Sequence, residues 1–226
     1  DVITWHDPFR LAPVYGRHKG LDCIGQWTYT HPDPKYTAYV ETMLTGAKPE
    51  RQMVMPDITT WEYQNWLAPT DSGVVFIPAD ILRENCWIAL SRRPDIICHY
   101  ISSSQNPTRD IDSWRRDPAT FDMMAWMSDN VYRPYGPFLL QMKRIPRKAA
   151  ILCSASSVLF PEISRGGWPN MAIYPFYSLL IMAHIPTDVI FDETITRYGL
   201  KQYDILFLHQ CETLTRSVYN EILAFQ

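Results

Sequence analysis

Gln52-Met53-Val54-Met55-Pro56-Asp57 is the stretch of sequence from which the fold can be inferred. It is a short apolar run that ends in a carboxylate, the pattern of a buried β-strand with a polar residue at its carboxyl end. A helix is expected over residues 78–91, and a second apolar run covers residues 95–102. A strand, a helix and another strand in this order predict a parallel pair of strands, because a crossover helix joins parallel neighbours.

The same alternation extends over the first two thirds of the chain. Strands are expected at residues 2–5, 22–29, 52–56 and 95–102, with helices at 34–44, 78–91 and from Asp117-Pro118 onward, and generous loops at 8–20 and 60–78. An Asp before a Pro is typical of a helix start. Four strand–helix units within residues 1–148 are too few to close an eight-stranded barrel, which needs about 250 residues. They fit the second half of a (β/α)8 TIM barrel.

A basic, proline-containing segment at residues 144–148 separates a second region with its own strand–helix rhythm. Strands are expected there at 149–154, 188–191 and 203–208, and helices at 172–183 and 213–225. We predict an α/β chain with a partial TIM barrel over 1–143, a linker over 144–148 and a partial flavodoxin-like parallel-sheet domain over 149–226. The first residues resemble the middle of a strand and the last ones the middle of a helix, so we expect an internal fragment.

Composition excludes several classes of function. The chain has 21 Lys and Arg against 24 Asp and Glu, a net charge of −3 that offers no basic surplus for nucleic acid. The uncharged run at 166–187 is long enough for a bilayer, but its three prolines predict a loop and a core helix instead. The five cysteines form no Cys-x-x-Cys pair. They are interpreted as buried free thiols, which favours a reducing compartment and leaves the localisation open.

Common catalytic and cofactor motifs are absent from the sequence, including glycine-rich phosphate loops and the nucleophile elbow of hydrolases. No cofactor is therefore expected. The six histidines lack metal-ligand spacing, and no metal is expected. A site assembled from His6, His31 and His99 at strand ends is conceivable, but hydrogen-bonded histidines are the simpler interpretation.

The carboxylates point to one residue in particular. Sugar hydrolysis normally requires two carboxyl groups that flank the glycosidic bond. Asp57 directly follows an apolar run, so its side chain could project into the mouth of a barrel; alternatively, it only caps the following loop. Glu62 lies five residues later, in the expected loop. The remaining glutamates before residue 144 are expected at solvated positions, namely Glu41, Glu50 and Glu84.

Polar and aromatic residues gather where the strands of the first region end. In a parallel sheet these ends face the ligand site. Flat aromatic rings stack on the apolar faces of pyranose rings, so a saccharide ligand is expected; the alternative is ordinary packing at a barrel rim. The candidate contacts are Trp5, His6, Asp7, Trp27, Tyr29, Trp61, His99 and Tyr100. Trp87 and Trp126 lie on expected helices and are assigned to the core.

Cys211 offers a competing interpretation in the second region. It follows an expected strand and precedes an expected helix, where glutamine amidotransferases of the flavodoxin-like type carry a nucleophilic cysteine. That sharp turn normally contains glycines, and none surrounds Cys211. A reactive thiol also needs a base or positive charge nearby. His209 is two residues away, and Cys211 is interpreted as unreactive.

Two stretches carry a resemblance to a known family. Ile81-Leu82-Arg83-Glu84-Asn85-Cys86-Trp87-Ile88-Ala89-Leu90 and Asp95-Ile96-Ile97-Cys98-His99-Tyr100 resemble the last helix and strand of the barrel in family 42-type β-galactosidases. The region from Lys148 is similar to the trimerisation domain that follows that barrel. The similarity rests on Ala183-His184-Ile185-Pro186-Thr187-Asp188-Val189-Ile190 and on Leu200-Lys201-Gln202-Tyr203-Asp204.

The resemblance implies a set of further expectations. The four early strands would be the fifth to eighth of the barrel. Asp57 would occupy the position of the family's nucleophilic Glu, one methylene shorter, while the family's acid lies on the fourth strand, upstream of residue 1. The second region would have an amidotransferase-like fold without that activity, and the protein would form a homo-oligomer, a trimer in the family.

The function expected is that of a glycoside hydrolase-like fragment acting on an oligosaccharide or glycoside with β-linkages, by a retaining mechanism if active. The alternative is a non-catalytic carbohydrate-binding or assembly module, so whether the protein is an enzyme stays open. As a nucleophile, Asp57 must lie at the carboxyl end of its strand and face the same mouth as Trp27 and Tyr100. A buried or outward Asp57 would argue against that role.

Overall fold

A computed structural model of the chain describes residues 3–6, 15–16, 20–28, 33–48, 52–63, 74–100, 118–160 and 169–226. The chain divides into two compact units. One consists of Asp1–Gly25, Thr42–Val54 and Ile145–Gln226, and the other of Gln26–Glu41 and Met55–Arg144. One boundary thus falls in the expected linker, while the others pass through elements of the first region.

The first region forms a four-stranded sheet whose strands lie in the order in which the chain reaches them. They are β1 (Trp5–His6), β2 (Cys23–Thr28), β3 (Met53–Thr59) and β6 (Cys98–Tyr100), in the order β1-β2-β3-β6. β1 pairs with β2 and β3 with β6, both parallel. The expected strands are found, although β1, β2 and β6 are shifted or shortened at their ends and β3 extends to Thr59, past the predicted end at residue 56. The expected loop at 60–78 contains an antiparallel pair, β4 (Trp61–Tyr63) and β5 (Val74–Phe76).

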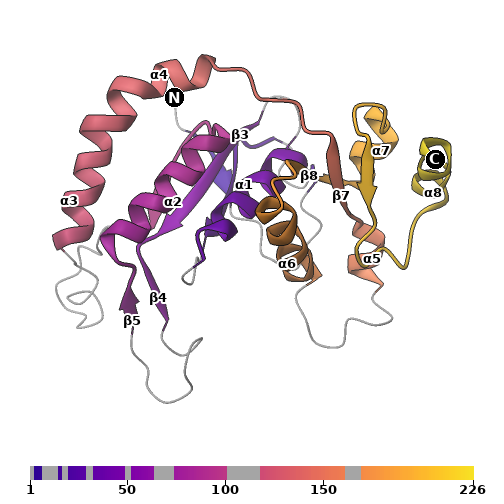
Figure 1. Ribbon diagram of the computed structural model, residues 1–226, viewed down its shortest axis with the longest axis horizontal. Helices are drawn as coiled ribbons and strands as arrows, with labels where there is room; N and C mark the ends of the chain where they lie inside the picture. Colours follow the sequence, from indigo (N-terminus) through magenta and orange to yellow (C-terminus); the bar gives the residue numbers. More distant parts are fainter. Residues whose placement is uncertain are drawn as a thin grey trace. The chain divides into compact units, whose positions relative to one another are not determined.

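The helices of the first region cover one face of this sheet. They lie over the part of the sheet around β3. α1 (Lys35–Ala47) and α2 (Ala79–Arg92) follow β2 and β5 in the chain. α3 (Pro118–Met127) begins at the proline that the sequence indicated, and continues through a π-helical turn, η3 (Ser128–Tyr132), into α4 (Arg133–Gln141). α2 and α3 lie side by side (Figure 1). Their contact buries a core of Ile58, Ile77, Leu82, Cys86, Ala89, Met123, Met127 and Val131.

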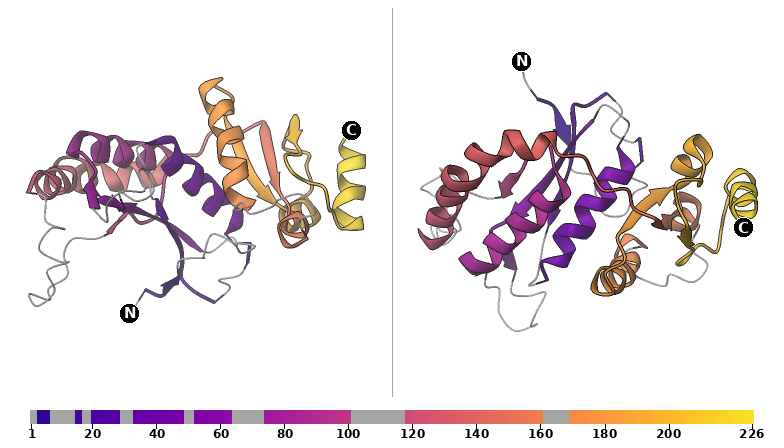
Figure 2. Two further views of the ribbon diagram at one scale, coloured as in Figure 1. Left: turned by 90° about the horizontal axis from the view of Figure 1, so that it is seen from below. Right: turned by 45° about the horizontal axis from the view of Figure 1, so that its top comes forward.

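The second region forms a three-stranded parallel sheet. Its strands are β7 (Ala149–Cys153), β8 (Thr187–Phe191) and β9 (Ile205–Phe207), in the order β8-β7-β9. The helices are α5 (Ala155–Leu159), α6 (Pro169–Met182), α7 (Asp192–Tyr198) and α8 (Arg216–Phe225). α6 packs against β7 and β8, while α7 and α8 contact each other (Figures 1 and 2). The sequence analysis did not predict the short helices α5 and α7.

The end of α1 packs against this second sheet. A Cβ atom on Gly46 would lie 1.9 Å from the carbonyl oxygen of Val189 on β8, so the two backbones approach as closely as glycine allows. The Thr42 and Tyr177 hydroxyls are hydrogen-bonded at 2.8 Å, and both residues are buried. These contacts explain why Thr42–Val54 belongs to the same compact unit as Ile145–Gln226.

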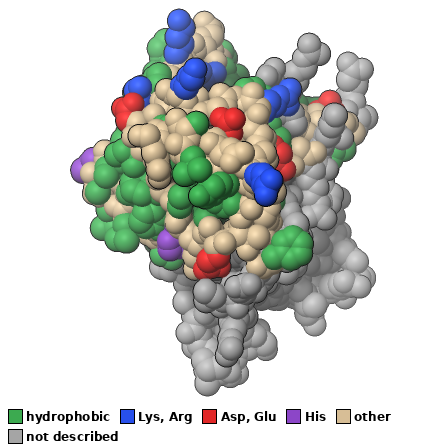
Figure 3. All heavy atoms as spheres, turned by 90° about the vertical axis from the view of Figure 1, so that its right-hand side faces the viewer, with side chains coloured by type: hydrophobic (Ala, Val, Ile, Leu, Met, Phe, Trp, Pro, Cys, Tyr) green, Lys and Arg blue, Asp and Glu red, His purple; other side chains and the backbone are tan. Residues whose placement is uncertain are grey.

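Three side chains do not lie where the sequence indicated. Trp87 and Trp126, assigned to the core, are 47% and 46% exposed. Glu41, assigned to a solvated position, is fully buried in α1. Large apolar side chains are also exposed over the C-terminal elements, where Figure 3 shows hydrophobic groups gathered on one face. The exposed ones on or beside β9 and α8 are Ile205, Leu208, Tyr219 and Leu223.

Two further features concern the cysteines and the uncharged run. All five cysteines are free, and Cys23, Cys86 and Cys153 are buried. Within the described ranges, no helix is both long and apolar enough to cross a bilayer. The uncharged run contributes α6, whose interior includes Pro175.

Candidate functional site

Asp57 lies on β3, two positions before the last residue of the strand. Its neighbour Ile58 belongs to the core beneath α2 and α3. Because successive side chains of a strand point to opposite faces, Asp57 points to the face of the sheet opposite these helices. The residue is only 1% exposed. It is thus near the carboxyl end of its strand, as a nucleophile requires, but buried rather than open at a mouth.

Two side chains from neighbouring strands meet the Asp57 carboxyl. Cys98 is its register partner on β6, so the two share a face of the sheet. Burial raises the pKa of Asp57 to about 6, whereas the polar groups of the neighbouring Cys98 and Trp27 side chains oppose this rise. The Oδ1 atom is buried and accepts no hydrogen bond from the described residues. The carboxyl is therefore largely protonated below pH 6.

The backbone around Asp57 is fixed by two threonines. The Thr28 hydroxyl on β2 donates to the Asp57 carbonyl oxygen at 3.3 Å, and the Thr59 hydroxyl donates to the Thr28 carbonyl oxygen at 2.7 Å. Thr28 and Thr59 are fully buried. These bonds hold β2 against β3 in one register, which brings Trp27 next to Asp57.

His99 faces the other side of the sheet. Its register partner is Ile58, so it points toward the helices and away from Asp57. The ring stacks on Tyr132 of η3, with centroids 6.4 Å apart and planes at 27°. Burial lowers the pKa of His99 to about 4, so the ring is neutral at physiological pH. Such a position suits packing between sheet and helices rather than contact with a ligand beside Asp57.

The other expected site residues are described to different extents. Trp5 is 44% exposed on β1 and pairs with Cys23 of β2. His6, Trp61 and Tyr100 lie on β1, β4 and β6, and only their backbone positions are described. Asp7 and Tyr29 fall outside the described residues. The structure thus brings together Asp57 and Trp27 of the expected set, and adds Cys98.

Cys98 is the member of this cluster that the sequence analysis missed. The apolar residues around it in the sequence predict a buried thiol. The available signal was strand parity: Cys98 stands two positions before Tyr100, a candidate contact, and therefore shares its face. The register between β6 and β3 decides whether this face is the one with Asp57 or the one with the helices. The sequence does not reveal that register.

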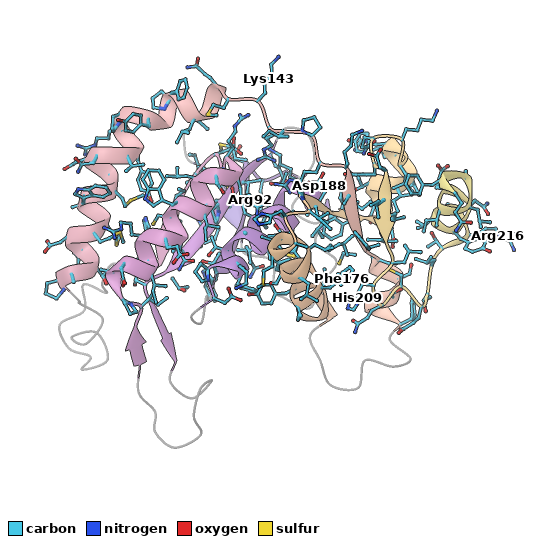
Figure 4. The ribbon with its side chains drawn as sticks, viewed as in Figure 1. Arg92, Lys143, Phe176, Asp188, His209 and Arg216 are labelled. Carbon is cyan, nitrogen blue, oxygen red and sulfur yellow. The ribbon has the colours of Figure 1, made fainter. Side chains whose placement is uncertain are left out.

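Cys211 has the environment of a structural thiol. Burial and the nearby Asp192 carboxylate raise its pKa to about 12, so the nucleophilic thiolate is disfavoured. The thiol lies 3.5 Å from the carbonyl oxygens of Leu152 and His209 and donates to them. His209 stacks on Phe176 at a centroid distance of 5.1 Å (Figure 4). This arrangement does not provide a base for Cys211.

Among the described residues, no group of three or more His, Cys, Asp and Glu side chains could hold a metal ion. Within the part of the chain that the structure describes, the two side chains that affect the Asp57 carboxyl are Cys98 and Trp27, which do not make up the donor set of a common protein metal site.

Comparison with known proteins shows similarity in fold without similarity in sequence. No family model matches the chain, and no curated protein is significantly similar to it in sequence. A β-galactosidase from the psychrophilic Marinomonas ef1 matches with a TM-score of 0.62 and 13% identity. The match covers 91% of this chain and 35% of that one.

Two other structures lead to the same conclusion. A catalytic mutant of a GH42 β-galactosidase from G. stearothermophilus matches with a TM-score of 0.66 and 16% identity, over 92% of this chain and 31% of that one. A GH5_18 protein from Bifidobacterium longum matches with a TM-score of 0.56 and 11% identity, over 90% of this chain and 52% of that one. The chain therefore has an α/β fold like that of glycoside hydrolases and spans about a third to a half of their length.

Proposed function

We propose that the chain forms the second half of a (β/α)8 glycoside-hydrolase-like barrel, and that the protein containing it binds or hydrolyses a β-linked saccharide. The observation that carries this proposal is the Asp57 carboxyl, held beside Trp27 and Cys98 on the face of a parallel sheet opposite its helices. In a barrel that face lines the interior, and the active site lies at the carboxyl ends of the strands. The similarity to two β-galactosidases over more than nine tenths of the chain supports the same assignment.

The proposed domains follow the two sheets. Strands β1, β2, β3 and β6 would be the fifth to eighth of the barrel, since a barrel requires spatial order to follow chain order. The order β8-β7-β9 corresponds to strands 2-1-3 of a flavodoxin-like sheet, which supports a partial domain of that type over residues 149–226. The exposed apolar residues of β9 and α8 would then be covered in the complete protein, by more of that domain or by another subunit of a homo-oligomer.

In the catalytic form of the proposal, Asp57 acts as the nucleophile of a retaining glycosidase. Its carboxylate would attack the anomeric carbon to form a covalent glycosyl ester, while a second carboxyl group protonates the departing oxygen. That reaction requires an ionised Asp57, hence a pH above about 6. It also requires access to a side chain that is 1% exposed. A second candidate function, saccharide binding without catalysis, is favoured by this burial and by the short Asp side chain.

Substitution of Asp57 separates the two functions. Asp57→Asn should lower kcat on a nitrophenyl β-galactoside at least about a hundredfold if the carboxylate attacks the sugar, measured in the protein with a complete barrel. Asp57→Glu adds the methylene found in the family and should retain or raise kcat. Asp122→Asn, at an exposed position of α3, is the control. Unchanged turnover of Asp57→Asn would remove Asp57 from the mechanism, and an inactive wild type that binds saccharides would establish the binding module.

A stability measurement shows that the variant is folded. The folded-state pKa of Asp57 is raised from 3.8 to about 6, so its protonated form is favoured by folding. The protonated Asp57 carboxyl therefore adds to the free energy of unfolding. This contribution is complete below pH 3.8 and is lost as the pH rises through 6. Asp57→Asn cannot ionise and should therefore unfold at a higher temperature than the wild type at pH 7. Loss of activity together with a raised melting temperature would identify a functional role rather than misfolding.

A further inference from the structure

The outer faces of α2 and α3 carry two exposed tryptophans on neighbouring helices. Trp87 is 47% and Trp126 is 46% exposed, although the inner faces of both helices are well packed. Leu82, Cys86 and Ala89 are fully buried on the inner side of α2. The helices lie side by side in the same compact unit (Figures 1 and 2). Within residues 1–226, the two rings are thus presented to solvent from helices whose inner faces are packed.

A shallow groove joins the two tryptophans. One part, about 510 Å³, runs along α2 and is lined by residues that include Asp80, Arg83, Glu84 and Trp87. A smaller part, about 200 Å³, lies between the helices and is lined by Asp80, Arg83 and Trp126, among others. Asp80 and Arg83 line both parts, so the two parts adjoin at these side chains.

Helical spacing explains the arrangement. Asp80, Arg83 or Glu84, and Trp87 follow one another at intervals of three or four residues, so they form one stripe along α2. From Asp80 to Trp87 the helix rises about 10 Å. Arg83 thus lies one helical turn from Trp87, and it also lines the part of the groove that reaches Trp126.

The three charged groups of the groove are available for a ligand. Among the described residues, Asp80, Arg83 and Glu84 take part in no ion pair or side-chain hydrogen bond. The guanidinium can only donate hydrogen bonds and the carboxylates can only accept them. Together they match the hydroxyl groups of a sugar, each of which both donates and accepts.

We propose that the groove between Trp87 and Trp126 binds a β-linked polysaccharide chain, as a second saccharide site on the outer surface. The indole rings supply flat apolar platforms for sugar rings, and Arg83 with the two carboxylates fixes the hydroxyls between them. The central region of a protein–protein interface is depleted in charged residues, whereas charged groups here separate the two rings. A neutral polyhydroxylated chain fits this alternation better than a protein surface does.

The ligand class rests on the proposed function, because it is the class that the barrel is proposed to bind. The site itself lies on the outer surface of the helices, whereas Asp57 points to the opposite face of the sheet. Binding in the groove and hydrolysis at Asp57 can therefore be lost independently, which makes the two proposals separable by experiment.

Affinity electrophoresis of the full-length protein, in gels containing soluble β-galactan, β-mannan or β-glucan, tests the groove. At least one of these polysaccharides should retard the wild type. Trp87→Ala and Trp126→Ala should each weaken the apparent affinity roughly tenfold, while Trp87→Phe retains part of it. Phe138→Ala is the matched control, because Phe138 is 63% exposed on α4 outside the groove. Turnover of a small nitrophenyl glycoside should be unchanged in all four variants.

The possible outcomes are distinct. Retardation lost in both alanine variants and kept in Phe138→Ala supports the groove. The proposal is overturned if none of the polysaccharides retards the wild type. It is also overturned if all variants are retarded equally. A change in oligomeric state on size-exclusion chromatography, caused by the tryptophan variants without any change in retardation, would assign the surface to a second copy and also overturn the proposal. Asp57→Asn, by contrast, should be retarded like the wild type even if it is inactive.

Discussion

Position within a strand decides the role of single residues in this protein. Asp57 and Ile58 are neighbours in β3, yet one meets Cys98 and Trp27 and the other packs beneath the helices. On β6, Cys98 and His99 are divided between the same two faces. The sequence showed that polar groups gather near the strand ends but not which face each takes, because a shift of one residue in register reverses every side chain. His99 was expected at the site for this reason.

The half-buried His99, whose ring nitrogens are both buried, should make the free energy of unfolding depend on pH. Its pKa is lowered from 6.5 to about 4 in the folded state, so the unfolded chain binds more protons between these values. The contribution of the neutral ring to the free energy of unfolding is complete above pH 6.5 and is lost as the pH falls toward 4. The loss is at most about 3 kcal/mol. His99→Phe keeps a ring beside Tyr132 and should lose less stability on acidification, as followed by melting temperature between pH 7 and 4.5.

A second histidine provides the control for this measurement. His184 is exposed and has a backbone φ of 57°, a conformation that asparagine tolerates, so His184→Asn is the matched substitution of a second histidine. Asp57 contributes a slope of opposite sign in an overlapping range, so the quantity to compare is the difference between variant and wild type. An identical loss of stability in His99→Phe and the wild type would show that His99 is not the titrating group.

At the scale of elements, the periodic spacing of apolar residues predicted the helices and strands that are long or buried. The strands β3 and β7 and the helices α2 and α8 follow apolar patterns that are visible in the sequence. The elements missed are short: β4 and β5 have three residues each, α5 has five and α7 has seven. Trp87 and Trp126 were misplaced because size and hydrophobicity indicate the core, whereas the packed stripe of α2 runs along its other side.

The approach of α1 to β8 gives a prediction for that helix. In Gly46→Ala, the new Cβ would lie 1.9 Å from the Val189 carbonyl oxygen, so α1 must shift away from the strand. Overpacking of this kind costs about 1–3 kcal/mol, and the higher helix propensity of alanine offsets only part of it. Urea denaturation should therefore show Gly46→Ala to be clearly less stable than the wild type.

Gly136 in α4 provides the comparison for Gly46. A Cβ there would meet no atom within 4 Å, so Gly136→Ala carries no packing cost. The helix propensity gained is opposed by the restriction that Pro137 places on its neighbour, and the stability should change by less than about 1 kcal/mol. Equal destabilisation by both substitutions would contradict the close contact between α1 and β8.

At the scale of the whole molecule, the distribution of Pro and charge predicted a linker but not the contacts that this segment makes. The segment 144–148 was expected to be a linker because it is basic and contains a proline. Arg147 within it has a side chain only 18% exposed. Its guanidinium donates to the Asp188 carboxylate at 2.9 Å and to the Thr187 carbonyl oxygen at 3.1 Å. Contacts between residues so distant in sequence leave no local pattern from which they could be predicted.

Arg147 should therefore stabilise the protein more than its neighbour Lys148 does. Arg147→Met leaves the Asp188 carboxylate, which also accepts a hydrogen bond from Tyr203 at 3.1 Å, without its cation, and should cost about 2 kcal/mol of unfolding free energy. Lys148 pairs with Asp204 at 3.6 Å, but both side chains are about two thirds exposed, at 64% and 66%. Lys148→Met should cost less than about 1 kcal/mol.

Salt dependence distinguishes these two ion pairs further. The Lys148–Asp204 pair is exposed and should be screened at 0.5 M NaCl, whereas the Arg147–Asp188 pair is partly buried and should keep most of its effect. Urea denaturation of the wild type and both variants at low and high salt measures the difference. If Arg147→Met costs no more than Lys148→Met at either salt concentration, the segment behaves as an ordinary linker and Arg147 does not join it to the second sheet.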